Sequence, residues 1–150
     1  MAKFIGEYTA KVDDKGRLIF PAPFKLLSEP EEGERQLFVV KKDLYANCLQ
    51  MFTYSEWEAE SEQIKSRLNF FNKEHAQFWR EYMRGRAVVE PDGKLGRISI
   101  PKAILAGIGV QKEVVFAGND HVIEIWAKEN YAAVQMSEDE LAELTEKLLG

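Results

Sequence analysis

The polar residues best placed for chemistry lie in one short glycine-containing segment, Asp13-Asp14-Lys15-Gly16-Arg17. Asp13 precedes Arg17 by four residues, so across a tight turn its carboxylate can accept hydrogen bonds from loop amides or hold the guanidinium in one orientation. Lys15 is then left exposed beside a positioned arginine. Such a pair suits contact with phosphate or two-pronged hydrogen bonding to the edge of a guanine.

The same spacing also has a purely structural interpretation. Asp13 and Arg17 could form an ion pair that only closes the turn, and exposed ion pairs are common and weak. Spacing alone favours this second interpretation, whereas the charge distribution supports the first. Residues 1–27 hold five Lys and Arg against three acidic residues, and residues 128–150 hold two against six. An acidic protein that binds nucleic acid needs this kind of separation.

Other reactive residue types have no pattern that indicates an enzyme. His75 and His121 are the only histidines, and neither has a cysteine or a second histidine at a metal-ligand spacing. Cys48 has no local signature of a nucleophile, so we expect a buried structural thiol. The segment 93–97, Gly-Lys-Leu-Gly-Arg, lacks the Ser or Thr ending of a phosphate-binding loop and predicts a β-turn. We expect neither a metal site nor a bound cofactor.

The elements that must position these residues occur twice. Residues 16–21 and 96–101 both read Gly-Arg-apolar-x-apolar-Pro. Each copy follows a short apolar stretch and precedes a short helical pattern and then two strand-like runs. The ranges are 4–12, 22–27, 36–40 and 48–52 in the first copy, and 87–90, 102–106, 113–117 and 122–126 in the second. Neither copy is large enough to bury a core alone, so we predict a pseudo-two-fold pair that folds as one body.

A different pattern separates the two copies. Residues 55–84 have helical periodicity, with a break expected near residues 69–72 and an N-terminal capping box at Ser55–Glu58. Aromatic residues fall on more than one side of this segment, which predicts that some contact a neighbouring subunit. A second capping box, Ser137–Glu140, opens a terminal acidic helix.

The composition of the chain restricts the class of protein and its expected location in the cell. The chain has 150 residues, a net charge of −5 and one cysteine, so an intramolecular disulfide is excluded and an intracellular protein is expected. No apolar run approaches the roughly 18 residues of a membrane span, and the N-terminal residues turn polar at Glu7 without a signal-peptide core. We therefore expect a soluble cytoplasmic protein without membrane contact.

Taken together, residues 4–8, 13–18 with Pro21, 96–101, 112–115 and 123–126 resemble the MraZ family, in the family's order and over residues 4 to about 131. The resemblance implies a mixed α+β fold in which two AbrB-like (SpoVT/AbrB) swapped-hairpin repeats form a pseudo-two-fold β-barrel with flanking helices. It implies a first repeat at 1–54, a helical connection at 55–84, a second repeat at 85–131 and an acidic C-terminal helix at 132–150.

The resemblance also implies a function. Proteins of this family are bacterial transcription regulators that bind short repeated boxes upstream of the division and cell-wall gene cluster, which includes their own gene. We therefore expect a sequence-specific, non-enzymatic regulator that binds double-stranded DNA, associates with the nucleoid and assembles into an octamer-like ring. The alternative is a ring-forming β-barrel scaffold that binds a protein partner without reading DNA.

The family's Asp-x-x-x-Arg motif transfers to individual residues. The first copy is intact, so the resemblance assigns Lys15 and Arg17 to DNA contact, with Asp13 and Gly16 positioning the loop. In the second copy Lys94 and Arg97 take the contact role and Gly96 the positioning role. The acid there is Asp92, one residue further from the arginine than in the first copy, so either the turn holds an extra residue or the carboxylate's role is lost.

Overall fold

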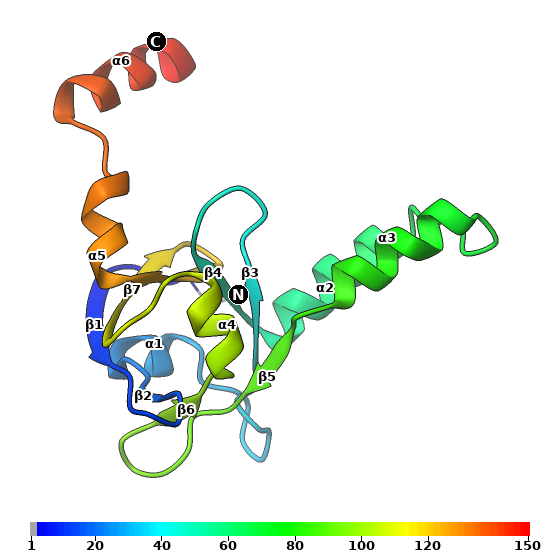
Figure 1. The fold of residues 1–150 in the computed structure, drawn as a ribbon, viewed down its shortest axis with the longest axis horizontal. Coiled ribbons are helices and arrows are strands. Elements are labelled where there is room, and N and C mark those ends of the chain that lie inside the picture. The colour runs from blue at the N-terminus through cyan, green and yellow to red at the C-terminus, as the bar shows by residue number, and fades with distance from the viewer. Residues whose placement is uncertain (1–2) are drawn as a thin grey trace.

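Antiparallel β-structure from both sequence repeats forms the body of the protein, which the computed structural model describes over residues 3–150 (Figure 1). Met1 and Ala2, the first residues of the N-terminal segment for which no signal peptide is expected, lie outside the described residues. A six-stranded sheet has the order β1-β7-β8-β4-β3-β5, and β2 pairs with β6 in a two-stranded sheet. The strands are β1 (Glu7–Lys11), β2 (Arg17–Ile19), β3 (Phe38–Lys42), β4 (Leu49–Thr53), β5 (Ala87–Val89), β6 (Arg97–Ser99), β7 (Glu113–Asn119) and β8 (Val122–Ala127).

Strands of one repeat pair with strands of the other at several places in the sheets. β1 of the first repeat pairs with β7 of the second, and β5 of the second pairs with β3 of the first. The strand order is also the same from either end when each strand is exchanged for its counterpart in the other repeat. The equivalent strands β2 and β6 pair with each other, as do β4 and β8. The repeats therefore share their sheets, and two separate domains joined by a free linker are excluded. The fold class is mixed α+β with antiparallel sheets.

One hydrophobic core joins the repeats. Phe24 is completely buried, and its ring meets Phe4 and Tyr8 edge-on at centroid distances of 5.5 and 5.1 Å. Phe20 of the first repeat packs edge-on against Phe116 of the second at 6.0 Å. Because large side chains from both copies meet in this one core, neither copy could bury its apolar residues alone.

The helices lie around this body. Short helices α1 (Ala22–Leu27) and α4 (Lys102–Gly107) follow the two Gly-Arg strands, and each bears one buried anchor, Phe24 or Leu105. Helices α2 (Tyr54–Lys65) and α3 (Lys73–Met83) form a hairpin that projects away from the sheets (Figure 1). The chain ends with α5 (Lys128–Tyr131), the 3₁₀ turn η1 (Ala132–Val134) and α6 (Glu138–Leu149). Among residues 3–150, no helix has the length and apolar character needed to cross a membrane.

The structure corrects the helix start predicted at Ser55. Helix α2 begins at Tyr54, and its N-cap is Thr53 at the end of β4, two residues before the predicted cap Ser55; the Thr53 side chain accepts a hydrogen bond from the Glu56 amide at 3.3 Å. The interhelical break spans residues 66–72 and so begins before the expected 69–72. The capping box at Ser137 is confirmed, since its side chain and that of Glu140 each accept a hydrogen bond from the other's amide.

Candidate nucleic-acid interface

The two-stranded sheet β2–β6 displays both motif arginines on one surface. Alternation along each strand buries Leu18 and Ile98, which are 2% and 1% exposed, against the core. Their neighbours along the strands must therefore point outward. Arg17 lies opposite Ser99 in the register, and Arg97 lies opposite Ile19. The two arginines are consequently diagonal neighbours on the outer face, where such positions are about 7–8 Å apart.

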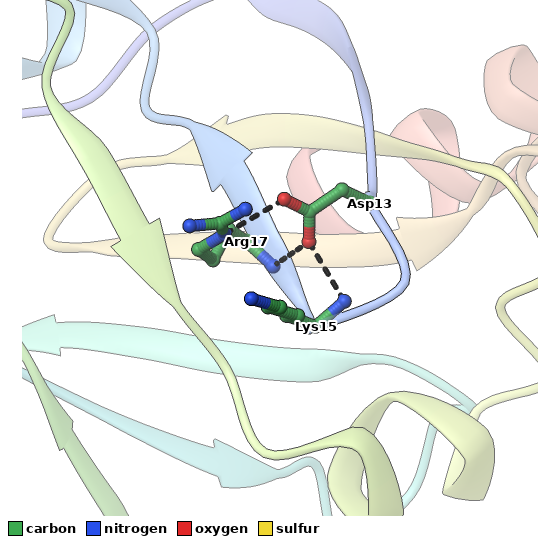
Figure 2. Close-up of polar contacts among 3 residues, drawn as sticks. All are labelled: Asp13, Lys15 and Arg17. Carbon is green, nitrogen blue, oxygen red and sulfur yellow. Dashed lines mark hydrogen bonds and ion pairs between the residues drawn. The ribbon is translucent and has the colours of Figure 1, made fainter.

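The first turn fixes Arg17 through one carboxylate. Oδ1 of Asp13 accepts hydrogen bonds from the backbone amides of Lys15 and Arg17, both at 2.9 Å. Oδ2 accepts from Nε of Arg17 at 2.8 Å, which orients the guanidinium without using its terminal amino groups (Figure 2). Those amino groups form no hydrogen bond within residues 3–150. The predicted Asp13–Arg17 contact is therefore present, and it leaves the outer edge of the arginine available.

These contacts change the acidity of Asp13. The hydrogen bond from the Arg17 amide, helped by the Arg17 side chain and the Lys15 amide, lowers the pKa of Asp13 from 3.8 to about 2. A lowered folded-state pKa means that the carboxylate stabilises the fold above pH 3.8. That contribution is lost as the pH falls through about 2.

Substitution of Asp13 should reveal this titration. We expect Asp13→Asn to lower the melting temperature modestly at neutral pH, because the ion pair is exposed. The difference from the parent protein should shrink as the pH falls from about 4 to about 2, where the parent carboxylate becomes protonated too. Thermal melts across this range measure it, with Asp14→Asn as the matched control because the Asp14 side chain forms no hydrogen bond or ion pair within residues 3–150. A difference that does not change with pH would contradict the role given to the carboxylate.

The second turn holds its arginine by a different arrangement. Asp92 and Arg97 form a backbone bridge in which each amide donates to the other's carbonyl at 2.8 Å. Because this turn has one extra residue, the Asp92 carbonyl accepts the hydrogen bond from the Arg97 amide. In the first turn the Asp13 carboxylate accepts the equivalent hydrogen bond from the Arg17 amide. Within the described chain, the Asp92 carboxylate has no hydrogen bond to Arg97. Both alternatives left open by the sequence are thus realised: the turn is one residue longer, and the clamp on the guanidinium is absent.

The two positioning glycines differ in how strictly the backbone requires them. Gly16 and Gly96 both have positive φ, +79° and +70°. A Cβ on Gly16 would in addition overlap the carbonyl oxygen of Ile100, whose own amide donates to Gly16 O at 2.9 Å. A Cβ on Gly96 would meet nothing closer than the Lys25 side chain at 3.7 Å. Gly16 is therefore required by conformation and by space, and Gly96 by conformation alone.

A second lysine, which the sequence pattern did not indicate, lies beside each turn. Space beside Gly16 is bordered by the Lys102 side chain of α4, and space beside Gly96 by Lys25 of α1. Lys15 and Lys94 at the turn tips are exposed. Each helix thus lies beside the turn of the other repeat. This exchange follows from β2–β6 pairing, so only knowledge of that pairing would have revealed Lys25 and Lys102.

A shallow hollow of about 510 Å³ runs beside the outer face of the β2–β6 pair. Both arginines line it, together with Ser99 and the carboxylate residues Glu90 and Asp92. Glu90 is already engaged, since Nε and Nη2 of Arg35 donate to its two oxygens at 3.1 and 2.8 Å, which lowers the pKa of the Glu90 carboxyl. Polar groups therefore dominate this surface, which differs from the mostly apolar pockets that take small molecules.

Cys48 lies away from this surface and is buried and unpaired, as predicted. Its Sγ and the carboxylates of Asp43 and Glu124 lie within 4.8 Å of one another. Burial, with the charge of Glu124 and then of Asp43, raises the pKa of the thiol to about 12. The thiol is therefore protonated at neutral pH and is a packing group.

The fold and this surface define a tandem-repeat protein with a basic two-stranded β-ribbon. The family model described as "MraZ protein, putative antitoxin-like" matches residues 83–150. The transcriptional regulator MraZ of Bacteroides thetaiotaomicron is 34% identical over 149 residues, covering 99% of this chain and 94% of that protein. The MraZ regulator of Christiangramia forsetii is 35% identical, covering 100% and 95%, and that of Carboxydothermus hydrogenoformans 38%, covering 93% and 94%. The chain therefore belongs to the MraZ family, a family of transcriptional regulators and not of enzymes.

Proposed function

We propose that this protein regulates transcription by binding double-stranded DNA through the outer face of the β2–β6 ribbon. The observation that carries the proposal is the diagonal pair Arg17 and Arg97 on an exposed ribbon whose other face is buried. The major groove of B-DNA, about 12 Å wide, admits a two-stranded β-ribbon. Basic turns at both ends of the ribbon would then lie near the phosphates on either side of the groove.

The basic residues of the ribbon and its turns have different proposed roles in DNA binding, which follow from how each side chain is held. Arg17, held by Asp13 through Nε, presents its terminal amino groups to a guanine edge or a phosphate. Arg97 has no such clamp, so it contributes contact with less orientation. Lys15 and Lys94 at the turn tips supply phosphate contacts, and Lys102 and Lys25 add charge beside the same turns. Gly16 and Gly96 set the turn conformations that place these groups.

The pairing of strands between the two repeats also supports a proposal about the fold. We assign the two sheets to one β-barrel made of two AbrB-like swapped-hairpin repeats, at residues 1–54 and 85–131. Residues 55–84 then form the helical connection, and residues 132–150 form the acidic C-terminal part. The interleaved strands and the exchange-symmetric strand order support this assignment.

The proposed target is the set of short repeated boxes upstream of the division and cell-wall gene cluster that includes the protein's own gene. The names of the MraZ relatives as transcriptional regulators support the regulatory part. One ribbon offers few contacts, so tight binding requires several subunits that engage adjacent boxes at once. Self-association into a ring supplies this, and the protein would act in the cytoplasm on the nucleoid.

A footprint and a salt titration test the proposal. We expect protection of repeated boxes in DNA upstream of the gene, and an affinity that falls steeply as salt rises. Scrambled DNA of the same length should bind far more weakly at one fixed salt concentration. An affinity that is equal for both DNAs and nearly independent of salt would refute DNA recognition. It would instead favour the alternative function, a scaffold that binds a protein partner. The fully exposed Phe71 of the α2–α3 hairpin is the observation that supports this alternative.

Lys15 should contribute affinity without specificity. We expect Lys15→Ala to weaken operator and scrambled DNA by similar factors, because a turn-tip lysine meets phosphate and not a base edge. The plot of log affinity against log salt should become less steep, its slope decreasing in magnitude by about 1 per lost contact. Electrophoretic shifts at four or more salt concentrations measure both effects. Lys147→Ala, on the exposed acidic helix α6, is the matched control and should leave the slope unchanged. Loss of operator binding alone would instead assign Lys15 to base reading.

A further inference from the structure

The tip of the α2–α3 hairpin, residues 65–73, combines positive charge with exposed aromatic surface. It holds Lys65, Arg67 and Lys73 and no acidic residue, and none of these three cations pairs with a carboxylate within residues 3–150. Phe71 is 102% exposed and Phe70 45%. A fully exposed phenylalanine at the centre of a basic segment is typical of a recognition surface.

The tip is also held in one conformation. The Asn69 amide donates to Nδ1 of His75 at 2.9 Å, and the Phe71 amide donates to Oδ1 of Asn69 at 3.0 Å. Asn72 caps α3 by accepting from the amides of Glu74 and His75. The exposed ring therefore sits on an ordered turn, so little conformational entropy is lost when it binds a partner.

A groove of opposite charge lies at the other end of the same helix. It has a volume of about 700 Å³ and runs between the loop of residues 28–37 and the first turn of α2. Carboxylates line it, and none of them forms an ion pair within the described residues; they are Glu29, Glu31, Glu34 and Glu56. The one cation of its lining, Arg35, is already bound to Glu90 through two hydrogen bonds. Apolar lining from Leu27, Leu37 and Tyr54 completes a site suited to an aromatic side chain between cations.

The tip and the groove of one chain cannot meet. The groove includes Thr53–Glu56 at the start of α2, whereas the tip follows its end, and the twelve residues of α2 separate them by about 18 Å. Figure 1 shows the hairpin pointing away from the body that carries the groove. A contact between these complementary surfaces must therefore join two molecules.

We propose that the hairpin tip of one copy docks into the acidic groove of the next copy. Phe71 enters between Leu27, Leu37 and Tyr54, and the tip cations meet the groove carboxylates. Because the two surfaces differ, the contact is head-to-tail, and its repetition produces a ring when the rotation closes. The inference rests on the proposed self-association, and it names the two surfaces that produce it.

Reciprocal charge reversal in the full-length protein tests the contact. The tip variant is Lys65→Glu/Arg67→Glu/Lys73→Glu, and the groove variant is Glu29→Lys/Glu31→Lys/Glu34→Lys. We expect each alone to have a monomeric mass by light scattering at a micromolar concentration where the parent assembles, because each then brings like charges together. An equimolar mixture should regain assembly, since each tip then meets a groove of opposite charge. The variant Phe71→Ser should weaken assembly at least tenfold without lowering the melting temperature.

The control reverses three acids elsewhere. Glu138→Lys/Asp139→Lys/Glu140→Lys on α6 changes the net charge as the groove variant does, and should keep the parent mass. A monomeric parent protein would refute self-association and this contact together. An assembled parent whose tip or groove variants keep its mass, or whose mixture stays monomeric, would refute this contact alone. Loss of DNA affinity in the tip variant with unchanged mass would also refute it, and would assign the tip to nucleic acid.

Discussion

Replacing Arg17 by alanine should lower operator affinity by roughly 1–3 kcal/mol for each engaged turn, about 5- to 150-fold. The lost groups are the terminal amino groups that Asp13 leaves free while it holds Nε. In the proposed assembly several turns bind DNA together, so the apparent loss should exceed that of a single contact. The fold should survive, since an exposed arginine contributes little to the core.

Operator and scrambled DNA, compared at one salt concentration beside thermal melts, measure this effect. Arg84→Ala is the matched control, because Arg84 is an exposed arginine paired with Glu81 on α3, away from the ribbon. It should keep the parent affinity. Full operator affinity in Arg17→Ala, with a reduced melting temperature, would mean that Arg17 only closes the turn.

Asp13→Ala separates orientation from simple electrostatics. Removal of a negative charge near DNA should raise affinity if only net charge matters. If the carboxylate orients Arg17, affinity should fall, because the guanidinium then samples many conformations.

Gly16→Ala should be the most destabilising of the small substitutions in the turns. A left-handed conformation costs an alanine about 1–2 kcal/mol, and the overlap with the Ile100 carbonyl adds about 1–3 kcal/mol. For a chain of this length the sum corresponds to a fall of roughly 4–20 °C in melting temperature. Operator binding should fall as well, because the displaced backbone carries both Lys15 and Arg17.

Alanine substitutions at two other glycines separate the cost of the left-handed conformation from the cost of the overlap with Ile100. Gly33 has φ of +86° and no atom within 4 Å of an added Cβ, so Gly33→Ala measures the conformational cost alone. Gly96→Ala should resemble it, although Gly96 occupies the equivalent place in the second turn. Calorimetry or thermal melts of the three variants give the ranking. Equal losses in all three would show that the Ile100 contact has no part in the effect.

Local signals predicted the elements of this fold well. Helix α1 has the predicted bounds, 22–27, and α4 runs one residue beyond the predicted 102–106. Both begin directly after a proline whose φ suits a helix start. Alternating apolar residues located β4 and β8 to within a residue at each end, because Leu49 with Met51, and Ile123 with Ile125, alternate along the strands and are buried in the core.

Features that depend on the geometry of a junction were harder to predict. Ser55 and Glu58 have the spacing of a capping box, but β4 leads directly into α2, so Thr53 at the end of the strand is the cap. In the second turn the sequence showed a displaced aspartate without showing that a backbone bridge replaces its carboxylate.

The site itself required long-range information. Arg17 and Arg97 were identified from their motifs, but their diagonal placement on one face follows from the β2–β6 register. No pattern within one repeat specifies that register. The contacts of Lys25 and Lys102 with the turns have the same origin, since each belongs to one repeat and lies beside the turn of the other.

The pairing of β1 with β7 also constrains how the chain can mature on the ribosome. Glu7 pairs with Ala117, more than a hundred residues later in synthesis. At about 5–20 residues per second, the first strand waits on the order of 5–20 s before its partner leaves the exit tunnel. During that interval Phe4, Phe20 and Phe24 lack the second half of their core. The shared core therefore forms only after β7 has emerged, and the long sequence separation between the paired strands β1 and β7 makes that step slow.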